Sequence, residues 1–240
     1  MKRILIVLAC CVLFPLSLLA QEFVKDVYDL TQEKGGTESC RVAVDIATKA
    51  LAANPNGYTE NWVMAQALRT YTDYYKREGK PGWKELCKEN GKKAMKYAEK
   101  AIFIKPDGVE AQFWYGCSVG TYSDGVSVLT ALKEGLKNKT QIGFEKAYAV
   151  NKTYNKGGPM KALGRFWDVL PWPLKNNEKA VKYLAEFNKY FPDDTEGLVF
   201  YGQALIENGK KDQAKIILQK AVASSDKYYA AEAKKMLGEI

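Results

Sequence analysis

Small and apolar residues recur at helical spacing between Thr195 and Tyr228. The dipeptide Asn208-Gly209 divides this segment into two amphipathic stretches, and it suits a turn because glycine tolerates the left-handed backbone at a helix end. The small residues fall where two antiparallel helices would cross, and the core positions of the second stretch share one face. These positions are Gly202, Leu205, Ala214, Leu218 and Ala221. The segment therefore predicts a regular helix–turn–helix repeat.

A second pattern recurs upstream: an alanine, a core residue seven positions later, and a proline five positions after that. Proline ends a helix at this point because it lacks an N–H group and clashes with the preceding turn. The three copies are Ala43, Ala50 and Pro55; Ala94, Ala101 and Pro106; and Ala180, Phe187 and Pro192. Together with the C-terminal repeat, they predict tetratricopeptide-like pairs of antiparallel helices.

Most of these repeats are irregular in length. Ala180 and Ala214 fit a 34-residue period, whereas the intervals from Ala43 to Ala94 and from Ala94 to Ala180 do not. We expect two further helices in the longer interval, over about 127–137 and 140–151. No segment alternates with the period of a β-strand. The pattern predicts an all-α solenoid of about twelve antiparallel helices with a concave inner surface.

The first twenty residues have the layout of a secretory signal peptide. Lys2 and Arg3 precede an apolar run from Ile4 to Ala20, and Gln21 follows it. A membrane anchor is the alternative, but the run is at the lower limit for spanning a bilayer. Gln21 also stands where a lipoprotein would carry its cysteine. We expect cleavage after Ala20 and a periplasmic or secreted protein with no membrane span.

The remaining chain is expected to form one domain. Residues 21–240 contain irregular repeats to about 194, the regular repeat at 195–228 and a capping helix that extends to 240. Three cysteines lie in this region: Cys40, Cys87 and Cys117. Cys117 lies in an apolar stretch and is interpreted as a small buried residue. A Cys40–Cys87 disulfide stays open, because the sequence does not decide it.

The composition narrows the classes of function. The chain has 36 Lys and Arg, 28 Asp and Glu, and no histidine. Without histidine, Ser-His-Asp and Cys-His nucleophiles and His-rich metal sites cannot form. The lysines are spread over helical faces, and no basic stripe is interleaved with aromatic residues, so nucleic-acid binding is not indicated. We therefore expect a binding protein, with no catalytic residues, no metal and no cofactor.

The stretch from Leu136 to Leu218 carries a more specific series of motifs. A helix that ends at Asn151 is followed by Gly157-Gly158-Pro159, by Ala162-Leu163-Gly164-Arg165 and by Leu170-Pro171-Trp172-Pro173. This order resembles the T-component of TRAP transporters, a periplasmic tetratricopeptide-like accessory protein, and the related repeat domain of regulators of microtubule dynamics. In layout the resemblance covers about residues 25–235.

The resemblance implies an exported, non-catalytic helical protein. In the T-component family, such a protein assembles around a pore or cleft and is thought to partner a solute-binding protein for an organic, hydrophobic acid. Members of that family are commonly lipid-anchored, whereas this chain has Gln21 at the anchoring position. The motifs also imply that Gly164 is a structural repeat position.

Aromatic residues and two arginines form the candidate ligand site. Several rings fall in the first helices of the pairs, which line the concave side of such solenoids, and we expect a minority of them to face a cavity. A guanidinium among such rings suits a carboxylate. The candidates are Trp62, Arg69, Tyr71, Trp114, Tyr122 and Arg165. For Arg165 we favour a structural role, in which it hydrogen-bonds the carbonyls of the 170–173 turn, and we expect Trp172 to plug that gap. For Arg69 the ligand-binding and structural roles are evenly balanced.

Two functions remain in view. The first is a protein-interaction scaffold that binds a protein partner, such as a periplasmic solute-binding protein. The second is a TRAP-transporter accessory that binds a small organic acid in an aromatic channel. An enzyme is the weakest interpretation, because no acid–base constellation is visible. The sequence leaves the oligomeric state open.

Overall fold

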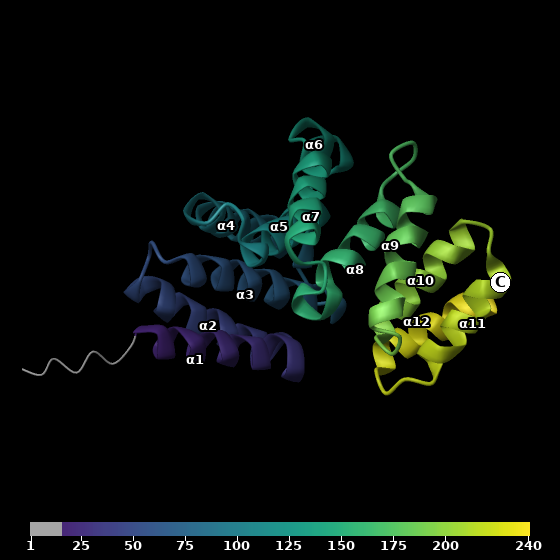
Figure 1. The fold of residues 1–240 in the computed structure, drawn as a ribbon, viewed down its shortest axis with the longest axis horizontal. Helices are drawn as coiled ribbons and strands as arrows, with labels where there is room; N and C mark the ends of the chain where they lie inside the picture. The colour runs from purple at the N-terminus through teal and green to yellow at the C-terminus, as the bar shows by residue number, and fades with distance from the viewer. Residues whose placement is uncertain (1–15) are drawn as a thin grey trace, which may run out of the picture.

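The computed structural model describes residues 16–240, and this part of the chain is helical throughout, with no strand (Figure 1). It contains twelve α-helices and a six-residue π-helical segment, η1, which confirms the predicted all-α solenoid. The elements are α1 Leu16–Tyr28, η1 Asp29–Lys34, α2 Thr37–Ala53, α3 Tyr58–Arg77, α4 Trp83–Ile104, α5 Val109–Gly125, α6 Val128–Lys133, α7 Leu136–Asn151, α8 Tyr154–Val169, α9 Asn177–Tyr190, α10 Thr195–Glu207, α11 Lys211–Val222 and α12 Lys227–Gly238.

The helices pack as successive antiparallel pairs. The pairs are α3 with α4, α5 with α7, α8 with α9 and α10 with α11, and neighbouring pairs touch through α4–α5 and α9–α10. Helices α1 to α5 lie on one side of the molecule and α9 to α12 on the other, with α7 and α8 between them (Figure 1). Helix α12 covers α10 and α11 at the C-terminal end. The chain therefore forms a continuous stack that curves around an inner surface.

The second helix of each pair presents alanine to its partner. Ala43, Ala94, Ala180 and Ala214 are fully buried, as are Ala101 and Ala221, and Phe187 is almost fully buried. Pro55, Pro106 and Pro192 follow directly on the ends of α2, α4 and α9. Each of these helices stops there because proline cannot continue the hydrogen-bonded ladder. Ala50 is only half-buried, and Ala47 occupies the core of α2 instead.

Glycine permits the closest helix crossings. A Cβ atom on Gly202 would lie 2.5 Å from the Cδ2 atom of Leu218, and one on Gly164 would lie 2.4 Å from the Cγ atom of Leu184. The two glycines thus have equivalent roles in α10 and α8. A Cβ on Gly91 would lie 2.5 Å from the backbone nitrogen of Tyr122, so α4 contacts the α5 backbone there.

The connection after α5 differs from the predicted helix over 127–137. Helix α6 ends at Lys133, because Gly135 adopts a left-handed conformation with φ of 64°. Helix α7 consequently begins at Leu136 rather than near residue 140. The predicted connector at Gly157 is a left-handed turn that also includes Asn155 and Lys156, with φ of 49° and 53°.

Two predictions about the 170–173 loop were wrong. Trp172 does not plug a gap, because it is 89% exposed. Arg165 does not hydrogen-bond the loop carbonyls, and its partners are side chains of α8 and α10. The loop is instead fixed by backbone bonds, in which Asn176 N–H donates to the Trp167 carbonyl at 3.1 Å.

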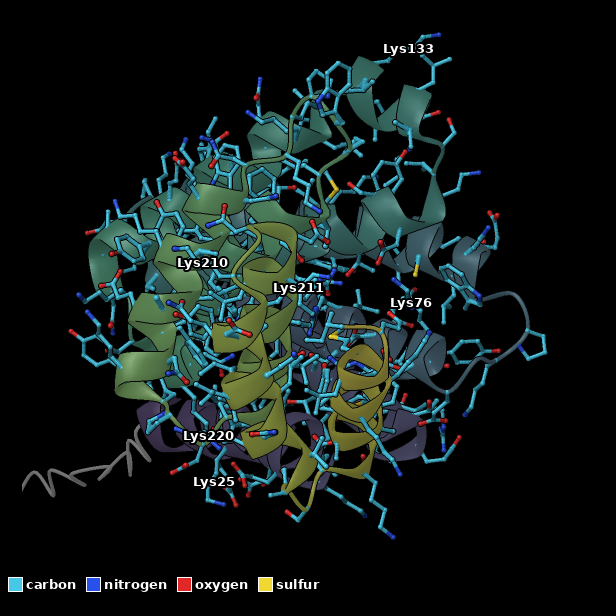
Figure 2. All side chains as sticks on the ribbon, turned by 90° about the vertical axis from the view of Figure 1, so that its right-hand side faces the viewer. Lys25, Lys76, Lys133, Lys210, Lys211 and Lys220 are labelled. Atoms are coloured by element: carbon cyan, nitrogen blue, oxygen red, sulfur yellow. The ribbon has the colours of Figure 1, made fainter. Side chains whose placement is uncertain are left out.

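The expected leader lies largely outside the described residues, which begin at Leu16. Helix α1 runs from Leu16 to Tyr28 and so includes the expected cleavage position after Ala20. The lysines of the described region are spread over the outer surface, with Lys133 at one end of the molecule and Lys25 and Lys220 at the other (Figure 2). This distribution matches a solvated exterior.

The contact between α4 and α5 gives a stability prediction. Gly91→Ala should lower the stability by about 1–3 kcal/mol, because the new methyl group meets backbone atoms of Tyr122 that cannot rotate away. Gly120→Ala in α5 is the matched control, since its Cβ meets no atom within 4 Å. The control should gain up to about 1 kcal/mol from reduced backbone entropy. Thermal unfolding followed by circular dichroism compares the two, and equal midpoints would contradict the close packing.

Candidate functional site

The inner surface of the stack encloses a cavity of about 980 Å³. Its wall includes side chains from η1 and from α3, α5, α8, α10 and α12, which are the first helices of successive pairs together with the capping helix. Helices α6 and α7 close one side. This cavity corresponds to the concave surface expected from the sequence, and residues far apart in the chain meet around it.

Aromatic rings form one wall of the cavity. Phe113 packs edge-on against Trp114, with ring centroids 4.9 Å apart, and it lies 6.1 Å from the ring of Phe144. The Trp114 indole N–H donates to the Tyr154 hydroxyl at 3.1 Å. Edge-to-face packing between the rings and the hydrogen bond of the Trp114 indole N–H hold these side chains in place. The wall is therefore formed before any ligand arrives.

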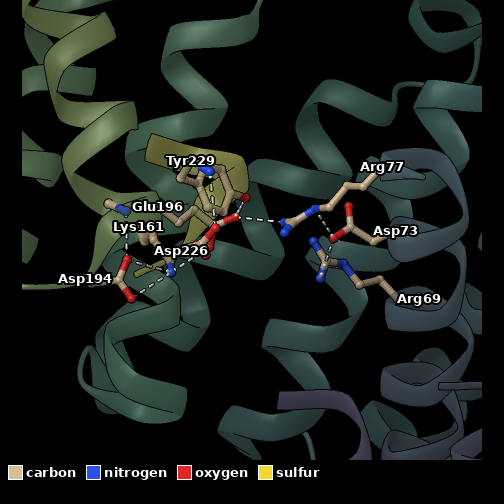
Figure 3. Close-up of polar contacts among 9 residues, drawn as sticks. Arg69, Asp73, Arg77, Lys161, Asp194, Glu196, Asp226 and Tyr229 are labelled. Carbon is tan, nitrogen blue, oxygen red and sulfur yellow. Dashed lines mark hydrogen bonds and ion pairs between the residues drawn. The ribbon is translucent and has the colours of Figure 1, made fainter. Parts of the chain in front are cut away.

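A chain of ion pairs crosses the cavity (Figure 3). Arg77 of α3 contacts Asp73 through Nε at 2.9 Å and Glu196 of α10 through Nη2 at 2.9 Å. The Lys161 ammonium of α8 lies 2.7 Å from Glu196 Oε2 and 3.2 Å from Asp194 Oδ1. Arg77 and Glu196 thus join the N-terminal and C-terminal halves of the stack.

The surroundings of Glu196 strongly favour its charged form. Burial alone would raise the pKa of this carboxyl, but the Lys161 ammonium and the Arg77 guanidinium outweigh burial and hold the pKa well below its usual range. The Tyr229 hydroxyl of α12 also donates to Glu196 Oε1. Burial, followed by the Glu196 charge, raises the pKa of Tyr229 well above its ordinary value, so Tyr229 remains a donor.

Arg69 has unused hydrogen-bonding capacity at the cavity wall. Its Nη1 atom lies 3.9 Å from Asp73 Oδ2, an oxygen that Arg77 contacts at the shorter distance of 2.9 Å. The side chain is 28% exposed and lines the cavity. A guanidinium carries five donors, and the described residues give Arg69 this one ion pair. The remaining donors of Arg69 have no hydrogen-bond partner among the described residues.

Arg165 also lines the cavity, but its Nη1 group is engaged by two other side chains. Its Nη1 atom donates to Asp168 Oδ2 at 2.7 Å and to Gln203 Oε1 at 2.8 Å, and the guanidinium lies 4.7 Å from the centre of the Phe200 ring. These contacts tie α8 to α10 and leave the carbonyls of the 170–173 turn uncontacted by Arg165.

The other three candidates lie away from the cavity. Trp62 is part of the buried core. Tyr122 is buried in a small cluster with its hydroxyl donating to Glu134 at 3.2 Å. Tyr71 faces a separate groove between α2, α3 and α4, beside Tyr97. Aromatic residues of a first helix can face either the core or the cavity, and the sequence alone does not distinguish these faces.

Apart from Arg69, the ion-pair residues were not among the candidates predicted from the sequence. Arg69, Asp73 and Arg77 are spaced four residues apart, which places them on one helical face, and this signal was available in the sequence. Lys161 and Glu196 carry no such local signal, because they meet only when α8 and α10 pack together. Among the described residues no cluster of Asp, Glu and Cys is suited to a metal ion.

The three cysteines are free thiols. Cys40 and Cys87 are buried and form no disulfide. Cys117 is half-buried rather than part of the core, and it lines the cavity near Arg69. Burial raises the pKa of the Cys117 thiol to about 11, which keeps it protonated and poorly nucleophilic. The cavity therefore holds no activated thiol at this position.

Comparison with known proteins gives a result at the level of the fold. No family model matches the sequence, and no curated protein matches it. Among solved structures, TTC0263, a thermophilic TPR protein of Thermus thermophilus, is similar with a TM-score of 0.65 at 14% identity, over 91% of this chain and 99% of that protein. The T-component family is not shown by any of these comparisons.

Two further solved structures are more distant. YrrB, a TPR protein with an unusual peptide-binding site, has a TM-score of 0.47 at 16% identity, over 90% of this chain and 92% of its own. MamA has a TM-score of 0.45 at 17% identity, over 89% of this chain and 96% of its own. The Thermus thermophilus structure and the helical pairing together establish that this chain has a tetratricopeptide-like helical-repeat fold.

Proposed function

We propose that this protein is a non-catalytic interaction scaffold that binds a peptide segment of a protein partner in its concave cavity. The observation that carries the proposal is that the first helices and the capping helix all contribute to one cavity of about 980 Å³. That volume is at the upper end of the range for small-molecule sites, about 300–1,000 Å³. A peptide segment fits such a space better than a small metabolite does.

The chemistry of the wall supports a peptide. Partly exposed apolar side chains such as Leu170 and Phe200 offer apolar contact, while charged side chains of both signs, including Lys161 and Asp194, line the same space. A peptide carries apolar side chains together with N–H donors and C=O acceptors, so it can satisfy both kinds of surface. A purely hydrophobic ligand would leave the charged groups desolvated without compensation.

Filling the cavity tests this function. Gly120 lies on the cavity wall in α5, and a Cβ there meets no atom within 4 Å, so Gly120→Trp starts a large side chain from open space at the wall. Peptides selected from a phage-displayed random library on the wild-type protein should bind the variant at least about tenfold more weakly, because the ring occupies their site. Fluorescence polarisation with a labelled selected peptide measures the affinity.

The matched control is Gly238→Trp, an exposed position at the end of α12 that also has open space around it. This variant should bind as the wild type does. If the selected peptides bind all three proteins equally, the cavity is not their site and the proposal fails.

A second function rests on Arg69. Because Asp73 engages Arg77 more closely, the Arg69 guanidinium is available for the carboxylate of a small organic acid, as a TRAP-transporter accessory would require. Arg69→Met should weaken binding of aliphatic and aromatic monocarboxylates by at least about tenfold, since charge-assisted hydrogen bonds are lost. Isothermal calorimetry measures this, with Arg41→Met on the exposed face of α2 as the control. Unchanged affinity in Arg69→Met would exclude this site.

We also propose that the protein is exported, with a periplasmic or extracellular protein as its partner, a solute-binding protein among the candidates. The support is the basic start at Lys2 and Arg3 and the apolar run that ends at Ala20. N-terminal sequencing of the protein from its natural source should find Gln21 first. Retention of Met1, or a lipid on Cys10, would contradict cleavage after Ala20.

A further inference from the structure

Helix α6 exposes apolar side chains that are not packed in the core of the protein. Val128 and Leu129 are each 61% exposed and Leu132 is 53% exposed, and no residue of this helix is buried. A short helix that folds for its own packing would turn such side chains inward. Helix α6 instead presents them to the surroundings.

The loop between α8 and α9 has the same property. Trp172 is 89% exposed and stands between Pro171 and Pro173, and Val169 at the base of the loop is 54% exposed. Tryptophan is among the most costly side chains to leave in water, because it has a large apolar surface. An exposed tryptophan on a loop tip therefore marks a contact with something outside the chain.

These two elements lie at the same end of the molecule. Helix α6 and the α8–α9 loop both project at the top of Figure 1, and Lys133 of α6 is at the top of the perpendicular view in Figure 2. Leu132 and Leu170 also line the same cavity. The exposed apolar residues of α6 and of the loop, which we call the apolar tips, therefore flank one edge of the cavity.

Lysines outnumber acidic residues in the two segments that carry the apolar tips. Segments 126–139 and 169–179 contain five lysines, Lys133, Lys137, Lys139, Lys175 and Lys179, and two glutamates, Glu134 and Glu178. Lys175 pairs with Glu207, which leaves four lysines without an ion pair among the described residues. The two segments that carry the apolar tips thus have a net positive charge.

We propose that the apolar tips dock onto the surface of an anionic lipid bilayer. Trp172 and the aliphatic side chains of α6 would enter the headgroup region, where tryptophan is favoured, while the lysines meet anionic headgroups. None of the described helices is long and apolar enough to cross a bilayer.

A lipid surface fits these tips better than a protein partner does. A protein interface places its aromatic anchors in pockets and forms a contiguous patch. Here the exposed side chains lie on two separate elements, helix α6 and the α8–α9 loop. Both elements project toward the same end of the molecule, and both segments contain more lysines than acidic residues. A soft anionic surface accepts separate projections without matching their shape. The proposal is independent of the peptide site.

Vesicle flotation of the protein without its leader, residues 21–240, tests the docking. Binding should be strong to vesicles of phosphatidylcholine and phosphatidylglycerol in equal parts, weak to phosphatidylcholine alone, and reduced by high salt. Trp172→Ala and Leu129→Asp should each weaken the binding by at least about tenfold. Brominated lipids should quench the wild-type tryptophan fluorescence more than that of Trp172→Ala.

Phe103→Ala is the matched control, because Phe103 is 87% exposed and lies at the end of α4, outside the apolar tips. It should float as the wild type does, and circular dichroism should show that every variant is folded. Equal binding of Trp172→Ala and wild type would overturn the proposal. The proposal would also fail if the wild-type protein did not bind vesicles. If the Trp172→Ala variant then bound the selected peptides more weakly than the wild type does, the apolar tips would belong to a protein-binding site instead.

Discussion

The fold depends on how closely successive helices approach one another. Two helices that cross at glycine or alanine bring their backbones into contact, and the apolar side chains on either side then interlock. This geometry occurs in two successive first helices, where Gly202 packs against Leu218 and Gly164 packs against Leu184. It also occurs between α4 and α5, where Gly91 packs against the backbone of Tyr122. The curvature of the stack follows from these crossings, and the concave cavity follows from the curvature.

The second constraint is electrostatic and acts across the cavity. The link from Arg77 to Glu196 joins helices that are 119 residues apart in the sequence, and Lys161 anchors the same carboxylate from α8. Because the pKa of Glu196 is lowered on folding, its contribution to stability is present above the ordinary carboxylate pKa of about 4.3 and is lost as the pH falls through the lower folded value. The link is therefore intact at neutral pH, where it fixes the width of the cavity.

The helices were predictable because their signals are local. Alanine spacing, terminating prolines and the Asn208-Gly209 turn depend on residues within a few turns of one another, and they predicted α2, α4, α9, α10 and α11. The site was less predictable. Arg69 lines the cavity, and Trp114 lies behind its wall with only 2% exposure, whereas Trp62 and Tyr122 face the core. Which face of a first helix meets the cavity depends on the crossing angles of its neighbours, and the spacing of aromatic residues does not contain that information.

The segments that depart from the regular repeat are the parts of the chain best suited to contact other molecules. A regular pair buries its apolar face against its neighbours. Helix α6 and the 170–174 loop connect the two helices of the α5–α7 pair and of the α8–α9 pair, and they carry Leu129, Leu132 and Trp172 at 53–89% exposure. Their apolar surface contributes little to folding and favours association with other surfaces. Stability thus resides in the repeated crossings, while the two connecting segments at the edge of the cavity are available for contacts outside the chain.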